Sequence, residues 1–180
     1  MSTIRFDTTP LKIGGWTILK LPRSASAKLP SRGMTLVEGT INGFHSKIVL
    51  EPDGKGSHWF PIDPGLRKAA GIDAGHTVTM AIEPSKEWPE PEVPADLNKA
   101  LASDPKANAL WTKITPMAHW DWLRWIRSTN NQGTRSRRIE VALSKLKSGE
   151  RRPCCFNRSL CTEPEVSKNG VLVEPTLTTQ

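Results

Sequence analysis

Arginine is the residue type that gives this sequence most scope for chemistry. The stretch from Arg124 to Arg158 contains ten lysines and arginines but only two glutamates, and it alone accounts for the excess behind the chain's net charge of +7. A surface of this sign attracts phosphate groups, although a moderate charge excess also serves solubility alone. The composition therefore leaves open both a polyanionic partner and a merely solvated basic face.

Two of these arginines fall on or beside the apolar side of an expected helix. Helical spacing puts Arg135 on the apolar arc and Arg138 at its edge. The other members of the arc are apolar: Ile139, Ala142, Leu143 and Leu146. Because an unpaired charge on such a face is costly, each guanidinium needs an anion. Asp104 and Asp121 are the candidate carboxylates for a structural ion pair.

An external ligand is the alternative interpretation of the same residues. Arg135 and Arg138 would then form an anion-binding site together with Arg67 or Lys68, between a barrel and the helices. Guanidinium groups suit this role because their N–H groups match the oxygens of carboxylates and phosphates. We keep both interpretations.

A second candidate platform combines tryptophan with arginine. Trp120 and Arg124 are four residues apart in an expected helix, so they can stack as a cation–π pair on the arc away from the core, beside Met117 and Arg127. Such a platform could hold a base, a phosphate or a peptide. The alternative is that Trp120 packs under a neighbouring element, since large aromatic side chains usually bury most of their area.

The three cysteines, Cys154, Cys155 and Cys161, lie within eight positions of one another. Their thiolates could bind a soft metal, but a structural zinc site needs four ligands and a fourth is not evident. Free thiols are the alternative. An odd, clustered set is a poor disulfide framework, and residues 1–10 show no secretory signal, so we expect a reducing cytoplasm.

The sequence contains no complete catalytic constellation. The four histidines have no metal-ligand spacing, and His119 is expected to be a satisfied core residue. There is no glycine-rich phosphate loop and no nucleophile elbow. We therefore predict no cofactor, no catalytic residue and a function that is not enzymatic. No apolar run approaches the roughly 20 residues needed to cross a bilayer.

Residues 1–83 are predicted to form a small β-barrel domain. Asn42-Gly43 separates two β-prone runs and favours a type I′ hairpin. Asp63-Pro64 is a capping signal for a short helix that ends at Gly71. Six short strands are expected: residues 4–6, 16–21, 34–41, 44–50, 57–62 and 77–83. Short strands with tight turns favour a closed or split six-stranded barrel.

The period then changes to helical. Residues 84–94 contain four prolines and three glutamates, so they are predicted to be a linker. Residues 95–152 are predicted to form a helical domain, and residues 153–180 a largely disordered, cysteine-containing tail. The expected helices cover residues 95–103, 105–111, 117–128 and 134–147. Asp104-Pro105, Thr115-Pro116 and Thr134 are the expected caps of the last three. The fold class is therefore α+β.

Two groups of motifs resemble known families. Gly39-Thr-Ile-Asn-Gly43, Leu66-Arg-Lys-Ala-Ala-Gly71 and Asp73-Ala-Gly75 resemble the small bacterial β-barrel domain of unknown function that often precedes an OmdA domain, of the double-split barrel type. Ala100–Pro105, Thr134-Arg-Ser-Arg-Arg-Ile139 and Leu146–Gly149 resemble the helical YdeI/OmpD-associated (OmdA) family, sometimes labelled bacteriocin-protection. The resemblance implies a bacterial cytoplasmic setting and no established reaction.

Three functions are consistent with these features. The preferred one is a non-enzymatic accessory or stress-related binding protein with an anionic ligand. The first alternative is a nucleic-acid-binding protein that uses the basic helices of the C-terminal half. The second is a thiol redox or metal protein that uses Cys154–Cys161. The sequence does not specify the ligand or the oligomeric state.

Overall fold

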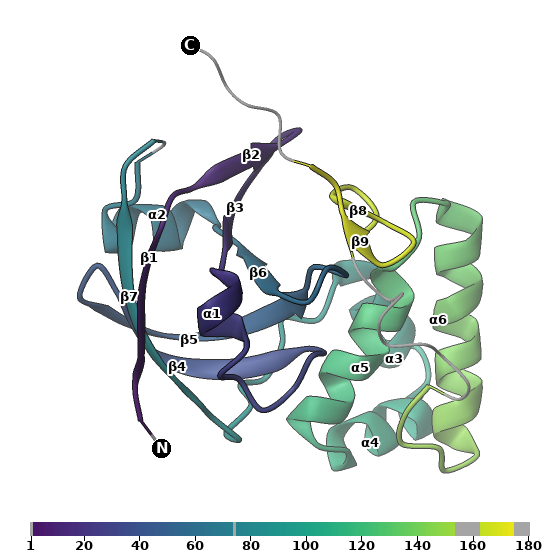
Figure 1. The fold of residues 1–180 in the computed structure, drawn as a ribbon. Helices are drawn as coiled ribbons and strands as arrows, with labels where there is room; N and C mark the ends of the chain where they lie inside the picture. Colours follow the sequence, from purple (N-terminus) through teal and green to yellow (C-terminus); the bar gives the residue numbers. More distant parts are fainter. Residues whose placement is uncertain (1, 74, 154–162, 175–180) are drawn as a thin grey trace. The chain divides into compact units, whose positions relative to one another are not determined.

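The computed structural model describes residues 2–73, 75–153 and 163–174 (Figure 1). These residues form two compact units. One consists of the residues up to Glu87 together with those from Glu165 onward, and the other is Trp88–Pro164.

The first unit is built on a strongly curled antiparallel sheet that forms a half-barrel (Figure 1). Its strand order is β1-β7-β4-β5-β6-β3-β2, so the sheet has one strand more than the sequence indicates. The strands are β1 (Ile4–Thr8), β2 (Leu11–Ile13), β3 (Trp16–Lys20), β4 (Thr35–Ile41), β5 (Phe44–Pro52), β6 (His58–Pro61) and β7 (Val78–Pro84). The additional strand, β2, has only three residues and depends on its pairing with β3.

Local turn chemistry fixes two features of this unit as predicted. Asn42 and Gly43 have φ values of 50° and 81°, the left-handed conformation that a two-residue hairpin between β4 and β5 requires. Helix α2 (Pro64–Ala70) begins after Asp63, whose Oδ1 accepts a 2.7 Å hydrogen bond from the Leu66 amide. It ends at Gly71, whose φ is 64°. A further short helix, α1 (Arg23–Ser26), was not expected.

A hairpin near the C-terminus completes the first unit. The tail was expected to be largely disordered, but Ser167–Lys168 (β8) and Val171–Leu172 (β9) pair around an Asn169–Gly170 turn. Val166 and Leu172 are buried in a cluster with three residues of the barrel, Ile13, Ile18 and Trp59. The apolar cover for these three side chains therefore comes from a segment more than 100 residues further along the chain.

The second unit is helical. Its helices are α3 (Ala95–Ala102), α4 (Pro105–Lys113), α5 (Pro116–Arg127) and α6 (Gln132–Lys147). Asp104 and Thr115 cap α4 and α5 through their side chains, as predicted. The cap of α6 is Asn131 rather than Thr134, because the Asn131 side chain accepts from the Thr134 amide at 2.9 Å. Helix α6 therefore begins two residues earlier than expected.

The apolar side of α5 faces the core of the helical unit. Trp122, Leu123 and Ile126 are buried there with Leu97, Leu101 and Trp111, and with Ile139, Ala142 and Leu146 of α6. Short helices gain most of their stability from such packing rather than from intrinsic propensity. None of the helices among the described residues has the length and apolar character needed to span a membrane.

Candidate functional site

Arg135 is held by an ion pair within the helical unit. Its Nε donates to Asp96 Oδ2 at 2.7 Å, and its Nη2 donates to Asp96 Oδ1 at 3.2 Å. The hydrogen bond from Arg135 is the main reason why the pKa of Asp96 lies below its ordinary value, and the same bond raises the pKa of Arg135. The predicted partners were Asp104 and Asp121, but Asp104 pairs with Lys147 at 2.9 Å. The carboxylate that pairs with Arg135 is instead that of Asp96, in the first turn of α3.

Arg138 is also used inside the unit. Its Nη1 donates to the Trp125 carbonyl at 2.7 Å and to Ser128 Oγ at 2.8 Å. Its guanidinium carbon lies 5.5 Å from the centre of the Trp125 ring, which is a cation–π contact. These contacts join α6 to the C-terminal end of α5, where backbone carbonyls lack helical partners. Arg138 therefore acts as a cap for α5.

The expected Trp120 and Arg124 platform does not face solvent as proposed, because Arg124 is only 1% exposed. Trp120 is half-buried, donates through Nε1 to the Pro89 carbonyl at 2.8 Å and lies against Trp88 at a ring distance of 6.3 Å. The expectation for His119 is confirmed, since its two ring nitrogens contact Glu90 and the Trp111 carbonyl at 2.8 and 2.7 Å. Part of the expected linker thus packs on α5.

Arg67 and Lys68 belong to the first unit, so the structure does not test a shared site with Arg135 and Arg138. Both lie on α2 and are exposed. Arg67 Nε donates to the Ile72 carbonyl at 3.1 Å.

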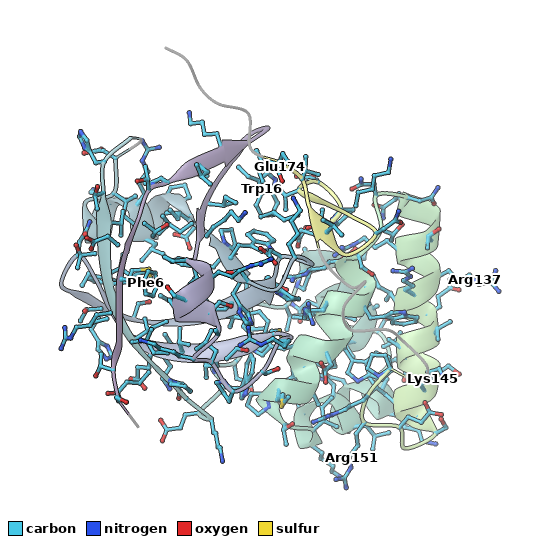
Figure 2. All side chains as sticks on the ribbon, in the orientation of Figure 1. Phe6, Trp16, Arg137, Lys145, Arg151 and Glu174 are labelled. Atoms are coloured by element: carbon cyan, nitrogen blue, oxygen red, sulfur yellow. The ribbon has the colours of Figure 1, made fainter. Side chains whose placement is uncertain are left out.

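Most of the basic stretch is occupied by contacts inside the helical unit. Besides Arg135 and Arg138, four of its cations form ion pairs with carboxylates: Arg127 with Glu163, Lys145 with Glu150, Lys147 with Asp104 and Arg152 with Asp121. In the described part of the stretch, the Arg137 and Arg151 side chains lack a hydrogen bond or ion pair, and Figure 2 shows both reaching outward. Most of the cations in this stretch therefore stabilise the helical unit through internal contacts.

Arg151 lines a hollow of about 560 Å³ in the helical unit, together with Lys113 and Arg152. Like Arg151, the Lys113 side chain contacts no acceptor among the described residues. The remaining lining is mostly small or apolar: Ile114, Thr115 and Ala118, with Glu150 as the single carboxylate. Because Glu150 is already paired with Lys145, Lys113 and Arg151 are the two lining cations without a described partner, and Ile114 and Ala118 lie beside them. We call it the basic hollow.

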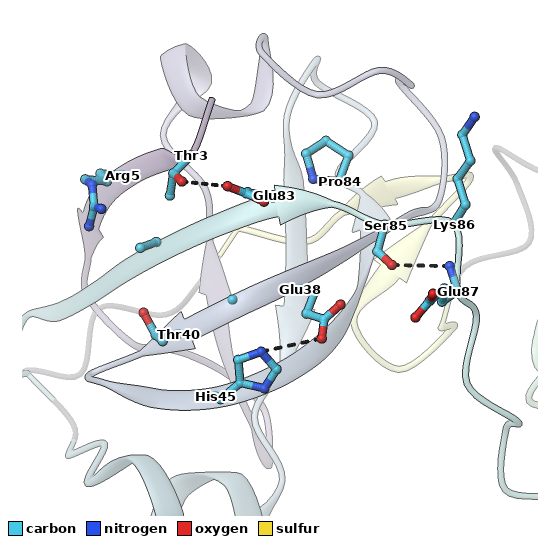
Figure 3. Close-up of a pocket in the computed structure, with 12 residues that line it drawn as sticks. Thr3, Arg5, Glu38, Thr40, His45, Glu83, Pro84, Ser85, Lys86 and Glu87 are labelled. Carbon is cyan, nitrogen blue, oxygen red and sulfur yellow. Dashed lines mark hydrogen bonds and ion pairs between the residues drawn. The ribbon is translucent and has the colours of Figure 1, made fainter. Parts of the chain in front are cut away.

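A larger hollow of about 730 Å³ lies on the sheet of the first unit (Figure 3). Among its polar side chains, Glu38 contacts His45 at 3.4 Å and Glu83 accepts from Thr3 at 2.7 Å, while Arg5 and Lys86 are its other cations. Gly39 is essential to its floor, because a Cβ there would lie 2.0 Å from the Ala81 carbonyl oxygen. The lining of this hollow thus carries three carboxylates as well as cations, whereas the basic hollow has a single carboxylate.

Sequence reasoning missed a buried polar cluster in the first unit. His58 and Ser26 are both fully buried, and Ser26 Oγ lies 2.5 Å from His58 Nδ1. His58 Nε2 lies 2.9 Å from the Gly33 carbonyl, an acceptor, so Nε2 carries the proton and Nδ1 accepts from the serine hydroxyl. Burial lowers the pKa of His58. The pair resembles a base and nucleophile, but complete burial excludes a substrate.

The cysteines proposed as weak metal ligands, Cys154, Cys155 and Cys161, lie outside the described residues. Within the residues that the structure does describe, no group of three or more His, Cys, Asp or Glu is arranged to hold a metal ion.

Comparison with known families covers most of the chain. Residues 2–82 match the model of a domain of unknown function, DUF1905. Residues 90–149 match the family described as bacteriocin-protection, YdeI or OmpD-associated, abbreviated OmdA. The two matches follow the domain order that the motifs suggested. No curated protein matches the chain.

Proposed function

Because the chain carries a DUF1905 domain followed by an OmdA domain, we propose that it is a non-enzymatic accessory protein whose OmdA domain binds a small organic anion in the basic hollow. The description of the OmdA family supports an accessory or stress-related role. The observation that carries the ligand class is the placement of Lys113 and Arg151, two cations without an internal partner, around one hollow.

The lining also indicates the kind of anion. Ile114 and Ala118 supply an apolar floor, and an apolar body on the ligand would remove that surface from water. Lys113 and Arg151 would bind its charged oxygens through charge-assisted hydrogen bonds. Arg152 is partly used by Asp121, at 3.6 Å, and serves mainly to keep the local potential positive. An aryl or alkyl phosphate or carboxylate fits this combination better than inorganic phosphate.

The test is a calorimetric or NMR titration of the full chain with phenyl phosphate and, separately, inorganic phosphate. Lys113→Gln and Arg151→Gln should each weaken phenyl phosphate binding about three- to tenfold, as expected for partly exposed charged contacts. Lys99→Gln and Arg137→Gln remove the same charge from exposed positions elsewhere on the unit and should leave binding unchanged. If all four variants lost the same affinity for phenyl phosphate, the loss would be due to net charge alone, and this would contradict the proposal.

A DNA titration of the same protein distinguishes anion binding in the basic hollow from nucleic-acid binding. Six of the ten cations in the basic stretch are committed to described contacts, so few remain to release counterions from DNA. Titration of duplex DNA at two salt concentrations should therefore give weak binding with a shallow salt dependence. A steep slope that Arg137→Gln reduces would favour the nucleic-acid alternative.

A further inference from the structure

A separate hollow of about 510 Å³ in the first unit combines an aromatic ring, a guanidinium and a carboxylate. Its lining comes from two places in the sequence, residues 15–17 at the start of β3 and residues 61–67 from the end of β6 into α2. Trp16, Pro61, Ile62 and Pro64 make much of it apolar, and Arg67 and Asp63 are its charged members. It lies entirely within the DUF1905 domain and is independent of the proposed anion site.

Two of its side chains are fixed by contacts that leave their binding groups available. Trp16 Nε1 donates to Glu165 Oε2 at 2.7 Å, which orients the indole. The half-buried ring also packs against the cluster that contains Ile13, Ile18 and Trp59, and another part of it lines the hollow. Arg67 Nε donates to the Ile72 carbonyl at 3.1 Å, which leaves the Nη1 and Nη2 groups without a described acceptor. A ring face and a planar donor fork are thus both held in place beforehand, and this lowers the entropy lost on binding.

Asp63 adds an acceptor beside these groups. Its Oδ1 accepts the Leu66 amide as the helix cap, and its other oxygen, Oδ2, is exposed and makes no described hydrogen bond. Arg67 and Asp63 have opposite charges, so the hollow carries little net charge and does not select for an anion. It offers instead a stacking surface with donors and an acceptor at its side.

We propose that this hollow binds a planar heteroaromatic molecule of the purine type, which stacks on Trp16 and presents acceptor atoms to Arg67 and an N–H donor to Asp63. Arginine is well suited to adjacent ring acceptors, and a carboxylate to adjacent N–H groups. Stacking on an aromatic side chain contributes affinity for any planar base, because every base has a π-face. Guanosine carries this arrangement of acceptors and donors on its base.

The experiment follows the backbone and Trp16 indole N–H resonances of the full chain during titration with guanosine. We expect shifts confined to residues 15–17 and 61–67. Arg67→Gln and Trp16→Leu should each weaken binding about tenfold, whereas Trp16→Phe, which retains a ring, should weaken it less. Asp63→Asn keeps the helix cap, since asparagine caps as well as aspartate, and should remove only the preference for guanosine over 1-methylguanosine.

Three outcomes would overturn the inference. These are the absence of shifts at millimolar guanosine, shifts that lie outside the two segments, and binding by the Trp16→Leu and Arg67→Gln variants that is as tight as binding by the unaltered chain. Lys68→Gln, a charge change on the same helix outside the hollow, serves as the matched control and should bind like the unaltered chain. Because no variant alters the basic hollow, phenyl phosphate binding should persist in all of them, and this separates failure here from failure of the proposed function.

Discussion

The Ser26 hydroxyl donates a 2.5 Å hydrogen bond to Nδ1 of His58, and the exposed fraction of both side chains is zero. This contact ties α1 to β6, two elements that lie 32 residues apart in the sequence. On the other side of the ring, Nε2 donates to the Gly33 carbonyl, so His58 connects both ends of the loop from Arg23 to Gly33. A neutral imidazole is the form that makes both bonds.

The first prediction concerns pH. Burial lowers the pKa of His58 below 6.5, and the nearby Arg32 acts in the same direction, whereas the Gly33 hydrogen bond, Asp53 and Glu51 oppose it. As the pH falls, His58 therefore takes up its proton in the unfolded chain before it does so in the folded chain. The stability that neutral His58 contributes is complete above pH 6.5 and is lost as the pH falls from 6.5 through the lowered pKa of the folded state. One proton limits the slope to about 1.4 kcal/mol per pH unit. NMR titration of the His58 ring should give a pKa below 6.5, and a value above 6.5 would contradict the assignment.

The second prediction tests the same bond by mutation. Ser26→Ala leaves His58 Nδ1 buried without a donor and should reduce the free energy of unfolding by about 1–3 kcal/mol. Ser24→Ala is the matched control, since Ser24 lies on the same short helix and is exposed. Urea denaturation of both variants gives the comparison. A cost for Ser24→Ala as large as that for Ser26→Ala would assign the effect to the helix rather than to the hydrogen bond.

The third prediction concerns the ion pair between Arg135 and Asp96. Arg135→Gln should cost about 0.2–1 kcal/mol at neutral pH, because the pair is partly exposed. The pKa of Asp96 is lowered mainly by Arg135, so the pair stabilises the protein above pH 3.8, and this contribution disappears as pH falls through the lowered value. Arg137→Gln, on the same helix, should show no such dependence. The measurement is urea denaturation at pH 7 and pH 3, and the difference between the two variants should be smaller at the lower pH.

The fourth prediction concerns the close approach of β4 and β7. Gly39→Ala places a methyl group 2.0 Å from the Ala81 carbonyl oxygen, so the strands must separate. We expect a loss of at least about 1–3 kcal/mol in the free energy of unfolding. Gly33→Ala, where the nearest atom would be 3.6 Å away and belongs to a side chain, is the control. Thermal unfolding that is the same for both variants would contradict the register of β4 and β7.

The fifth prediction tests whether the C-terminal hairpin is part of the first unit. Leu172 is 3% exposed and packs in the cluster with Ile18 and Trp59, whereas the adjacent Val173 is 44% exposed. Leu172→Ala should cost about 2–5 kcal/mol, and Val173→Ala little. The free energy of unfolding of each variant is measured by urea denaturation followed by circular dichroism. If both variants unfold like the unaltered chain, the hairpin does not contribute to the core.

Local signals allowed much of the fold to be predicted. Asn42-Gly43, Asp63-Pro64 and Thr115-Pro116 each determine a turn or a helix start through the conformations and hydrogen bonds of a few neighbouring residues. The same Asn-Gly signal was present at Asn169-Gly170 but was missed, because two-residue strands show no alternation and depend on the barrel for their stability. Strand β2 was missed for the same reason.

The candidate site was harder to predict because charge pairing is a tertiary property. Periodicity indicated that Arg135 needs an anion and left Asp104 and Asp121 as candidates, but the partner is Asp96, which lies 39 residues away in the sequence. Lys113 and Arg151 differ from the paired cations of the helical unit only in their lack of a described partner. That property is visible only when every other pair has been assigned.

The division of the first unit between the two ends of the chain has a consequence for biosynthesis. A ribosome releases residues 88–164 before it releases Val166 and Leu172. During that interval Ile18 and Trp59 are without the side chains that finally cover them. The nascent half-barrel therefore exposes an apolar surface until the OmdA domain has been translated, and at that stage the chain is most in need of a chaperone.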